Sequence, residues 1–282
     1  MENANDPFIA ATRLLKDEQK LCLHNLHLDE NTHITSNSKT LRTVLRKKSF
    51  DEWCQLPHKG KGVALFGEVH TMNRWMQTRA GISTTEWTTA IKLNTNTVPV
   101  RSIPGRSHDN RCRHISCNEI ETLGHVLGSC PKNDLLRNVR HHKVRTMIAD
   151  AFRKLQWEVH EEISCISEEG SLRRVDIIAI EPHRKSAIII DPTIRLETSL
   201  DQAAEVHLEK QKIYSPCIPD LSKKYLIANW EVIGLLIGAR AAIPKFLRNF
   251  FQQYNLPISL LKSICISVLK DSIKIIHHHL YS

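Results

Sequence analysis

The chain has 282 residues, of which 41% are hydrophobic, and a formal net charge of +9 at pH 7. This hydrophobic fraction is that of an ordinary folded protein and excludes a fully disordered chain. Eight cysteines are too few for a secreted disulfide scaffold of this length. The longest apolar run worth testing, Val232 to Ala239, cannot cross about 30 Å of hydrocarbon, so we expect no transmembrane helix and no membrane partner.

The positive charge is concentrated in one segment. Residues 39–113 contain 14 Lys and Arg against 5 Asp and Glu, and the remainder of the chain has 25 of each sign. Such a concentration attracts the phosphates of DNA or RNA and releases counterions on binding. A solvated basic face is the alternative that charge alone leaves open. The candidate nucleic-acid-binding arginines of this segment are Arg101, Arg106, Arg111 and Arg113.

The first half of the chain is predicted to be helical and rich in loops. Ser83 or Thr84, followed by Glu86, has the composition of a helix N-terminus. The predicted elements are a helix over about 8–23, a polar linker over 30–40, a basic helix from Leu41, a loop over 58–62, a helical segment around Trp75, a short helix from residue 83 or 84, and an extended basic stretch over 95–111.

The second half changes from a helical period to strand patterns, with β-branched runs between turn residues. The predicted elements are a long helix over 133–156, strands over 157–163, 173–181 and 186–194, a helix over 200–214, a strand from near Tyr225 that continues over 232–238, and helices over 241–253 and 258–274. The short turn between the second and third strands predicts an antiparallel hairpin. The sequence therefore predicts a mixed α/β fold.

Three cysteines and a histidine form a metal-type cluster. Cys112, Cys117, His125 and Cys130 are separated by four, seven and four residues. Zinc takes four S and N ligands in closed structural sites, and this segment has too few apolar residues to fold without a metal. We therefore predict a structural zinc site that leaves no position for an activated water. The alternative ligands nearby are His108 and His114, and the alternative to a metal site is that the four residues are separate buried or incidental side chains.

Two aspartates lie in otherwise apolar strand sequences, Asp176 in RRVDIIAI and Asp191 in AIIIDPTI. An Asp in such a run is costly unless it is paired or binds a cation. The predicted hairpin brings both acids near the same end of the sheet, where their oxygens suit one or two Mg²⁺ ions. Mg²⁺ there would polarise a phosphodiester and activate the attacking water. The alternative for each acid is a turn residue at the end of a strand, or an ion pair with Arg173, Arg174 or Arg195.

A cation beside the acids would stabilise the charge that develops on a phosphodiester during hydrolysis. Lys210 and Lys212, in the helix after Asp191, are the candidates, and the sequence does not choose between them. Lys210 lies one helical turn before Tyr214, so both side chains can face the same side. A solvated helix face is the alternative for Lys210.

Together these motifs resemble the C-terminal region of polyproteins from site-specific non-LTR retrotransposons, of the type that inserts into ribosomal RNA genes. The resemblance extends over nearly the whole chain. The segments that carry it are GVALFGEVHTMNRWM and EWTTAIKLNTNTVPVRS in the connector after the polymerase, ETLGHVLGSC in a CCHC zinc knuckle, RNVRHHKVRTMIADAF at the start of the endonuclease, RRVDII and IIIDPTI with its paired Asp residues, and EKQKIY with its Lys and Tyr.

The resemblance implies a restriction-endonuclease-like sheet flanked by helices, preceded by a helical basic connector and a small zinc knuckle. The implied divisions are a lead segment and linker over 1–38, a basic connector over 39–107, a CCHC knuckle over 108–132 and an endonuclease domain over 133–282. The implied function is metal-dependent nicking of target DNA, which also implies a nuclear location. The residues that match the family motifs are Asp176 and Asp191 as magnesium ligands, Lys210 as the catalytic lysine with Tyr214 beside it, and Arg140 and His141 as the opening Arg-His pair, assigned here to nucleic-acid binding.

Several positions depart from the family pattern. Val175 stands where Pro is usual, His142 stands where Asn is expected, and Thr193 occupies the place at which many nucleases of this fold carry their Lys. No polymerase motif such as Tyr/Phe-x-Asp-Asp is visible, so we expect the tail of a polyprotein without its reverse transcriptase. A catalytically inactive zinc-knuckle remnant that binds nucleic acid is the main alternative, and an unrelated zinc-binding interaction protein is a third.

Overall fold

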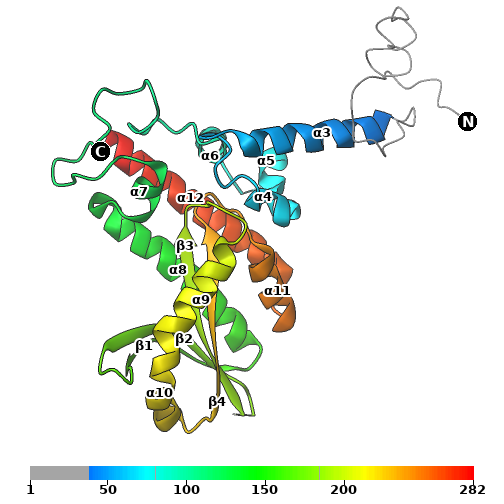
Figure 1. The fold of residues 1–282 in the computed structure, drawn as a ribbon. Coiled ribbons are helices and arrows are strands. Elements are labelled where there is room, and N and C mark those ends of the chain that lie inside the picture. The colour runs from blue at the N-terminus through cyan, green and yellow to red at the C-terminus, as the bar shows by residue number, and fades with distance from the viewer. Residues whose placement is uncertain (1–37, 80, 184) are drawn as a thin grey trace, which may run out of the picture. The chain divides into compact units, whose positions relative to one another are not determined.

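The computed structural model describes residues 38–79, 81–183 and 185–282 (Figure 1). The chain divides after Leu56 into two units, residues 1–56 and 57–282. In the first unit the described element is helix α3 (Ser38–Gln55), which confirms the basic helix predicted from Leu41. The helix predicted over 8–23 lies outside the described residues.

The second unit begins with short helices. These are α4 (Leu65–Glu68), η1 (His70–Arg74), α5 (Trp75–Thr78) and α6 (Thr84–Asn94). Helix α6 begins where its cap was predicted: the Glu86 N–H donates to the Ser83 hydroxyl, and the Ser83 N–H donates to the Glu86 carboxylate. These two reciprocal bonds satisfy N–H groups that the first helical turn leaves without partners.

The sheet has four strands in the order β1-β2-β3-β4. They are β1 (Glu158–Ile166), β2 (Leu172–Ile180), β3 (Ser186–Arg195) and β4 (Asn229–Gly238). β2 pairs antiparallel with β1 and β3, and β3 pairs parallel with β4, so the predicted hairpin between β2 and β3 forms. The parallel step is bridged by α9 (Gln202–Tyr214), η3 (Ser215–Cys217) and α10 (Ile218–Tyr225).

Helices cover both faces of this sheet (Figure 1). Helices α8 (Asp134–Lys154) and α12 (Ile258–Tyr281) share a hydrophobic core with one face, while α9 and α10 pack on the other. In β3, for example, Ile188 and Ile190 face the α8 side, whereas Ile189 faces the α10 side. Because both faces are buried, the strands read as continuous apolar runs. The prediction of a mixed α/β fold with flanking helices is confirmed.

Two element predictions between β3 and α12 need correction. The strand predicted from near Tyr225 is wrong: these residues end helix α10, and β4 begins only at Asn229. Pro219 fits the first turn of α10, buried Leu221 anchors it, and Leu226 ends it with a left-handed φ of 58°. The helix predicted from residue 241 begins at Lys245 as α11 (Lys245–Gln253). The ring of Pro244 disfavours helical geometry at the residue before it, so the helix cannot start earlier.

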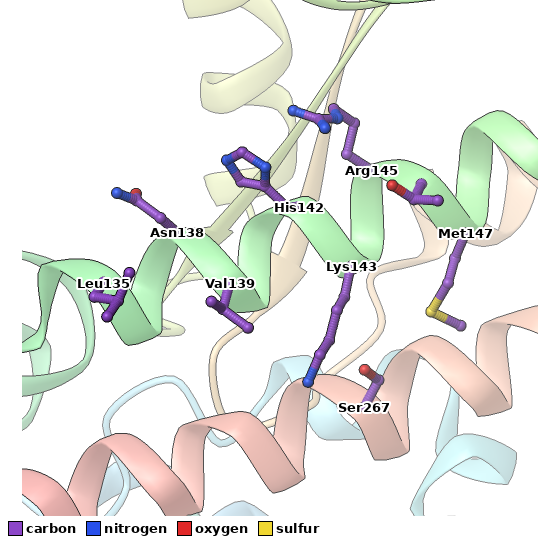
Figure 2. A pocket seen from close by; sticks show the side chains of 9 residues that line it. Leu135, Asn138, Val139, His142, Lys143, Arg145, Met147 and Ser267 are labelled. Atoms are coloured by element: carbon purple, nitrogen blue, oxygen red, sulfur yellow. The ribbon is translucent and has the colours of Figure 1, made fainter.

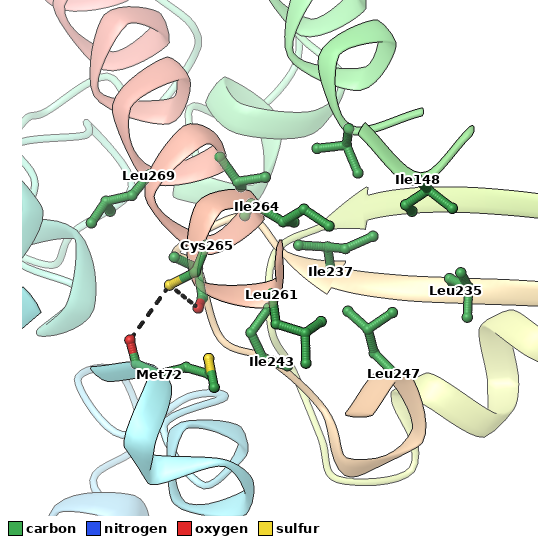
Figure 3. Close-up of a cluster of buried hydrophobic side chains, with 14 of the residues drawn as sticks. Met72, Ile148, Leu235, Ile237, Ile243, Leu247, Leu261, Ile264, Cys265 and Leu269 are labelled. Carbon is green, nitrogen blue, oxygen red and sulfur yellow. Dashed lines mark hydrogen bonds between the residues drawn. The ribbon is translucent and has the colours of Figure 1, made fainter. Parts of the chain in front are cut away.

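The region expected as a connector packs into the same core as the sheet. Met72 of η1 belongs to the apolar cluster that also contains Ile237 of β4 and Leu261 of α12 (Figure 3). Sγ of Cys265 lies 3.6 Å from the Met72 carbonyl oxygen and 3.4 Å from that of Ala241. The boundaries at residues 107 and 132 stay predictions, since the division of the chain falls after Leu56.

A buried ion pair ties this connector to the end of the sheet. Arg240 and Glu197 are both fully buried, with Nε of the guanidinium 2.9 Å from the carboxylate. The same guanidinium donates to Asn96 Oδ1 and to the Lys61 carbonyl, each at 2.9 Å. Gly62 has φ +71°, and a Cβ there would lie 2.0 Å from the Glu197 carbonyl oxygen, so glycine is required.

The segment predicted as a knuckle, residues 108–132, contributes the short helix α7 (Leu123–Gly128) and a bridge between Arg111 and Ile120, and η2 (Pro131–Asn133) follows. It is called the knuckle below. Across the described ranges, no helix combines the length and the apolar character needed to cross a membrane.

Candidate functional site

The two predicted acids lie at a fork in the sheet. The pairing between β2 and β3 ends at Ile177 and Ile190, and one further step in this register would set Asp176 opposite Asp191. Beyond this point β2 continues only with β1, and β3 continues only with β4. The strands therefore separate at the acids, and a pocket opens where a ladder would otherwise close.

Asp191 is buried and accepts hydrogen bonds on both oxygens. Lys210 Nζ lies 3.1 Å from Oδ2, the Tyr214 hydroxyl donates to Oδ2 at 2.9 Å, and the Thr193 hydroxyl donates to Oδ1 at 3.0 Å. Burial, together with the charge of Asp191, raises the pKa of the Tyr214 phenol. Tyr214 therefore stays protonated and donates to the carboxylate. The helical turn between Lys210 and Tyr214 brings both onto one acid.

Asp176 is partly buried and meets a residue from helix α8. His141 Nε2 lies 3.1 Å from Asp176 Oδ2. Burial lowers the pKa of His141, but the hydrogen bond and the negative charges of Asp176 and Asp191 outweigh it and raise the pKa. His141 is thus held at the acids rather than on an outer surface.

These groups line a pocket of roughly 320 Å³. Asp176, Asp191, Lys210 and His141 all face it, whereas Lys212 is exposed and does not line it. Two of the three strand arginines that the sequence left open as ion-pair partners bind other acids: Arg174 binds Glu162 and Arg195 binds Glu209. The geometry therefore brings Lys210, and not Lys212, to the acids.

The donor set at the fork suits a hard cation with several of its own waters. Two carboxylates are a common protein contribution to Mg²⁺ binding, with the remaining positions left to water and phosphate oxygens. In the described part of the chain, the sets of three or more His, Cys, Asp and Glu whose ligand atoms all lie within 4.8 Å of one another are both at the knuckle. At the fork, Asp176 and Asp191 are the two carboxylates that could hold such an ion.

The four predicted zinc ligands do converge. Cys112, Cys117, His125 and Cys130 are all buried, with their ligand atoms within 4.8 Å of one another. Sγ of Cys112 lies 3.8 Å from Sγ of Cys130, and Sγ of Cys117 lies 3.4 Å from Nε2 of His125. A tetrahedral zinc site with Zn–S of about 2.3 Å and Zn–N of about 2.0 Å has S–S edges near 3.8 Å and S–N edges near 3.5 Å. These residues therefore fit zinc.

Local structure explains how the knuckle presents these atoms. The Cys117 N–H donates to the His114 carbonyl across a tight turn, and Thr122 caps helix α7 by accepting from the His125 N–H. Nδ1 of His125 lies 3.3 Å from the Ser129 hydroxyl, which leaves Nε2 for the sulfur side. Burial lowers the pKa of His125 and raises that of Cys112 to about 12. A metal must therefore drive thiol deprotonation when it binds.

The arginines predicted to bind nucleic acid separate into two groups. Arg106 and Arg111 are exposed and Arg101 is partly exposed, all on the approach to the knuckle. Arg113 instead binds Glu121 at 2.7 Å. Arg140 is 2% exposed and donates to the Leu127 carbonyl and to the Ser272 hydroxyl, both at 2.8 Å.

Sequence reasoning missed three residues around the knuckle. Glu121 and His279 are fully buried, and His279 Nε2 lies 3.2 Å from the Glu121 carboxylate. Asn133 Nδ2 lies 3.1 Å from Nδ1 of His279. Hydrogen bonds from Arg113 and Arg101 outweigh the burial that raises the pKa of Glu121, and hold it at about 2. The alternative ligand His114 packs its ring 4.7 Å from His279, outside the four-ligand set.

A larger pocket of roughly 710 Å³ runs between α8 and α12 (Figure 2). Leu135 and Val139 line it, and its cations are already neutralised: Arg145 pairs with Glu161 at 3.0 Å and Lys143 pairs with Asp271 at 2.8 Å. Among the described residues that line this pocket there is no carboxylate, so it lacks the acids that the fork provides.

Comparison with known proteins gives relatives that all carry the same name. No protein-family model matches the chain. Three sequences from Popillia japonica, each named "Retrovirus-related Pol polyprotein from type-1 retrotransposable element R2", are similar to it. The first is 26% identical over 198 residues, which is 69% of this chain and 40% of the relative. The second is 25% identical over 220 residues, which is 66% of this chain and 30% of the relative.

This similarity supports the interpretation that the chain is a region of a non-LTR retrotransposon polyprotein. The chain spans 40%, 30% and 26% of the lengths of the three relatives. What the whole polyproteins do is therefore a matter of proposal for this chain.

Proposed function

We propose that this chain is a metal-dependent DNA endonuclease region of a retrotransposon polyprotein, which nicks a target site in the nucleus. The observation that carries the proposal is the fork of β2 and β3, where two aspartates, a lysine and a histidine line one pocket and the Tyr214 hydroxyl bonds one of the acids. Mixed environments of this kind, with acids and cations in a cleft, are typical of catalytic sites. The similarity to R2 polyproteins supports the retrotransposon polyprotein part of the proposal.

The roles of the side chains follow from their contacts. Asp176 and Asp191 would hold Mg²⁺, which polarises the scissile phosphate and lowers the pKa of the attacking water. Lys210 sits 3.1 Å from Asp191, so its ammonium is fixed where negative charge develops on the phosphate. Tyr214 and Thr193 hold the Asp191 carboxylate in one orientation. His141 does the same for Asp176.

The knuckle and the basic approach would bind the nucleic acid. A closed zinc site has no free coordination position, so its task is structural. Zinc would keep residues 112–130 folded, and the exposed Arg106 and Arg111 would contact phosphates from this platform. Arg113 is paired with Glu121, and Arg140 is buried and bonded to Ser272 while it also lines the acid pocket, so both have a structural part as well.

A plasmid-nicking assay tests the nuclease. Purified protein is incubated with supercoiled plasmid and Mg²⁺, and the conversion to open circles is followed with time. We expect Asp191→Asn to lower the rate on the order of 10²–10³-fold, the size of effect seen when one electrostatic stabiliser is lost. The control Asp150→Asn, an exposed acid of α8 outside the acid pocket, should nick like wild type. Equal nicking by Asp191→Asn and wild type would point to a contaminating nuclease.

The second candidate is a catalytically inactive remnant that still binds nucleic acid. It is favoured by the departures at Val175 and Thr193, where the family pattern expects Pro and many related nucleases carry Lys. This candidate predicts salt-dependent DNA binding by the zinc-loaded protein but no nicking with either Mg²⁺ or Mn²⁺. The same preparation can be used for both measurements, so one set of experiments separates the two.

A further inference from the structure

The end of helix α12 is built into the zinc knuckle. This helix runs to Tyr281, beyond the residue 274 at which the sequence predicted its end. In its run of three histidines, His277 is exposed while His279 is fully buried. A buried imidazole at the end of a chain is costly unless its polar atoms are satisfied. The contacts of His279 explain why it is there.

Both ring nitrogens of His279 are engaged, and in only one consistent way. Asn133 Nδ2 lies 3.1 Å from Nδ1, and the Asn133 amide can only donate there. Nδ1 is therefore the acceptor, and Nε2 carries the hydrogen. Nε2 lies 3.2 Å from the Glu121 carboxylate and 3.9 Å from Sγ of Cys112. The imidazole is thus a neutral donor directed at the edge of the ligand set.

These contacts connect the two halves of the ligand set. Glu121 lies between the Cys112–Cys117 turn and helix α7, and Arg113 fixes its carboxylate through Nε at 2.9 Å and Nη2 at 2.7 Å. Asn133 follows Cys130, and its amide also donates to the Val126 carbonyl of α7 at 3.0 Å. His279 touches one partner on each side, so it bridges the early and late ligands.

Two further bonds hold the helix end in place. Arg113 donates to the Leu280 carbonyl at 3.3 Å, and His278 Nδ1 lies 3.0 Å from Asn133 Oδ1. The last turn of α12 therefore closes the Cys112 side of the cluster. His279, which makes this contact, lies 158 positions after Glu121 and 167 positions after Cys112 in the sequence.

We propose that the last turn of α12 completes the zinc site, with His279 and Glu121 as positioning residues that hold Cys112 for the metal. This inference rests on the zinc site proposed above. His279 is not itself a ligand, because the four-ligand set is already full. Cys112, Glu121 and His279 also lie within 4.8 Å of one another, but Arg113 and the Arg101 N–H already occupy the Glu121 oxygens. Partners behind the ligands typically change metal affinity by 10–100-fold.

Zinc affinity of the full chain tests the proposal. Zn²⁺ is titrated against a chromogenic chelator for wild type, His279→Leu, His279→Gln and the control His277→Leu, which changes an exposed histidine of the same helix. We expect His279→Leu to weaken zinc binding by about 10–100-fold and His277→Leu to leave it unchanged. His279→Gln should recover part of the loss, because its amide can still donate to Glu121.

A cobalt spectrum separates positioning from general loss of fold. Co²⁺ in place of zinc should give a thiolate charge-transfer band that His279→Leu weakens or shifts, while far-UV circular dichroism stays that of wild type. Wild-type zinc affinity in His279→Leu would overturn the proposal, as would an equal loss in His277→Leu. Should His279→Leu not fold, the zinc affinity of His279→Gln is compared with that of wild type instead, and an equal affinity would overturn the proposal. Cys130→Ser tests the zinc site itself: unchanged zinc content there would remove the site, and not only the role of His279.

Discussion

The position of Lys210 depends on a glycine in the neighbouring strand. Gly234 of β4 is paired with Asp191, and helix α9 crosses directly over it. A Cβ at residue 234 would lie 2.7 Å from Cγ of Lys210 and 2.8 Å from the Val206 carbonyl oxygen. The lysine stem can bend, but the carbonyl belongs to the helix backbone. Gly234→Ala must therefore move α9 away from the sheet.

The size of the effect follows from these distances. To bring the contact of 2.8 Å back to an ordinary 3.4 Å, α9 must move by about 0.6 Å. The same movement carries the backbone of Lys210 away from Asp191, so its ammonium, now 3.1 Å from the carboxylate, must be held there by a more extended stem. Overpacking of this kind costs about 1–3 kcal/mol of the free energy of unfolding. Displacements approaching 1 Å in a catalytic group lower rates by up to about 100-fold.

Two measurements check this reasoning. Urea unfolding gives the change in the free energy of unfolding, and plasmid nicking gives the change in rate, which we expect to fall by about 10–100-fold. The control is Gly124→Ala in helix α7, where the added methyl group meets its nearest atom at an ordinary 3.5 Å. Unchanged stability in Gly234→Ala would refute the packing argument. Lower stability with unchanged nicking would refute the role given to Lys210.

Two further predictions concern the connector and the basic approach. Glu197→Gln leaves the buried Arg240 guanidinium without its counter-charge, so the free energy of unfolding should fall by about 3–5 kcal/mol. Urea unfolding measures this change, and an unchanged midpoint would refute the role of this ion pair. Changing Arg101, Arg106 and Arg111 together to Gln should weaken DNA binding and reduce the slope of log affinity against log salt by up to about 3. An unchanged slope would show that these side chains do not contact phosphates.

Much of the fold could be predicted because its signals are local. The spacing of Cys112, Cys117, His125 and Cys130 lies within one short segment, so their convergence needs only a tight turn and one short helix. The hairpin of β2 and β3 follows from two apolar runs joined by a turn. The error near Tyr225 arose because a short apolar run fits a helix as well as a strand.

Contacts between distant residues could not be predicted in the same way. Arg140 is placed in the sequence like a phosphate-binding residue, yet its guanidinium is buried and hydrogen-bonded inside the protein. Its partners come from other elements, such as Ser272 of α12. Nothing in the local pattern distinguishes an arginine that faces solvent from one that a distant helix covers.

The sequence by itself determined the order of most helices and strands, the zinc-type ligand set and the two acids in apolar strands. These depend on residue spacing along a single segment. Only the tertiary structure decided that Lys210 and not Lys212 meets Asp191, and that the chain end at His279 lies against Cys112. The physical reason is that each contact depends on how near two packed elements come to each other. Gly234 sets this distance for Lys210, and the buried Glu121 sets it for His279.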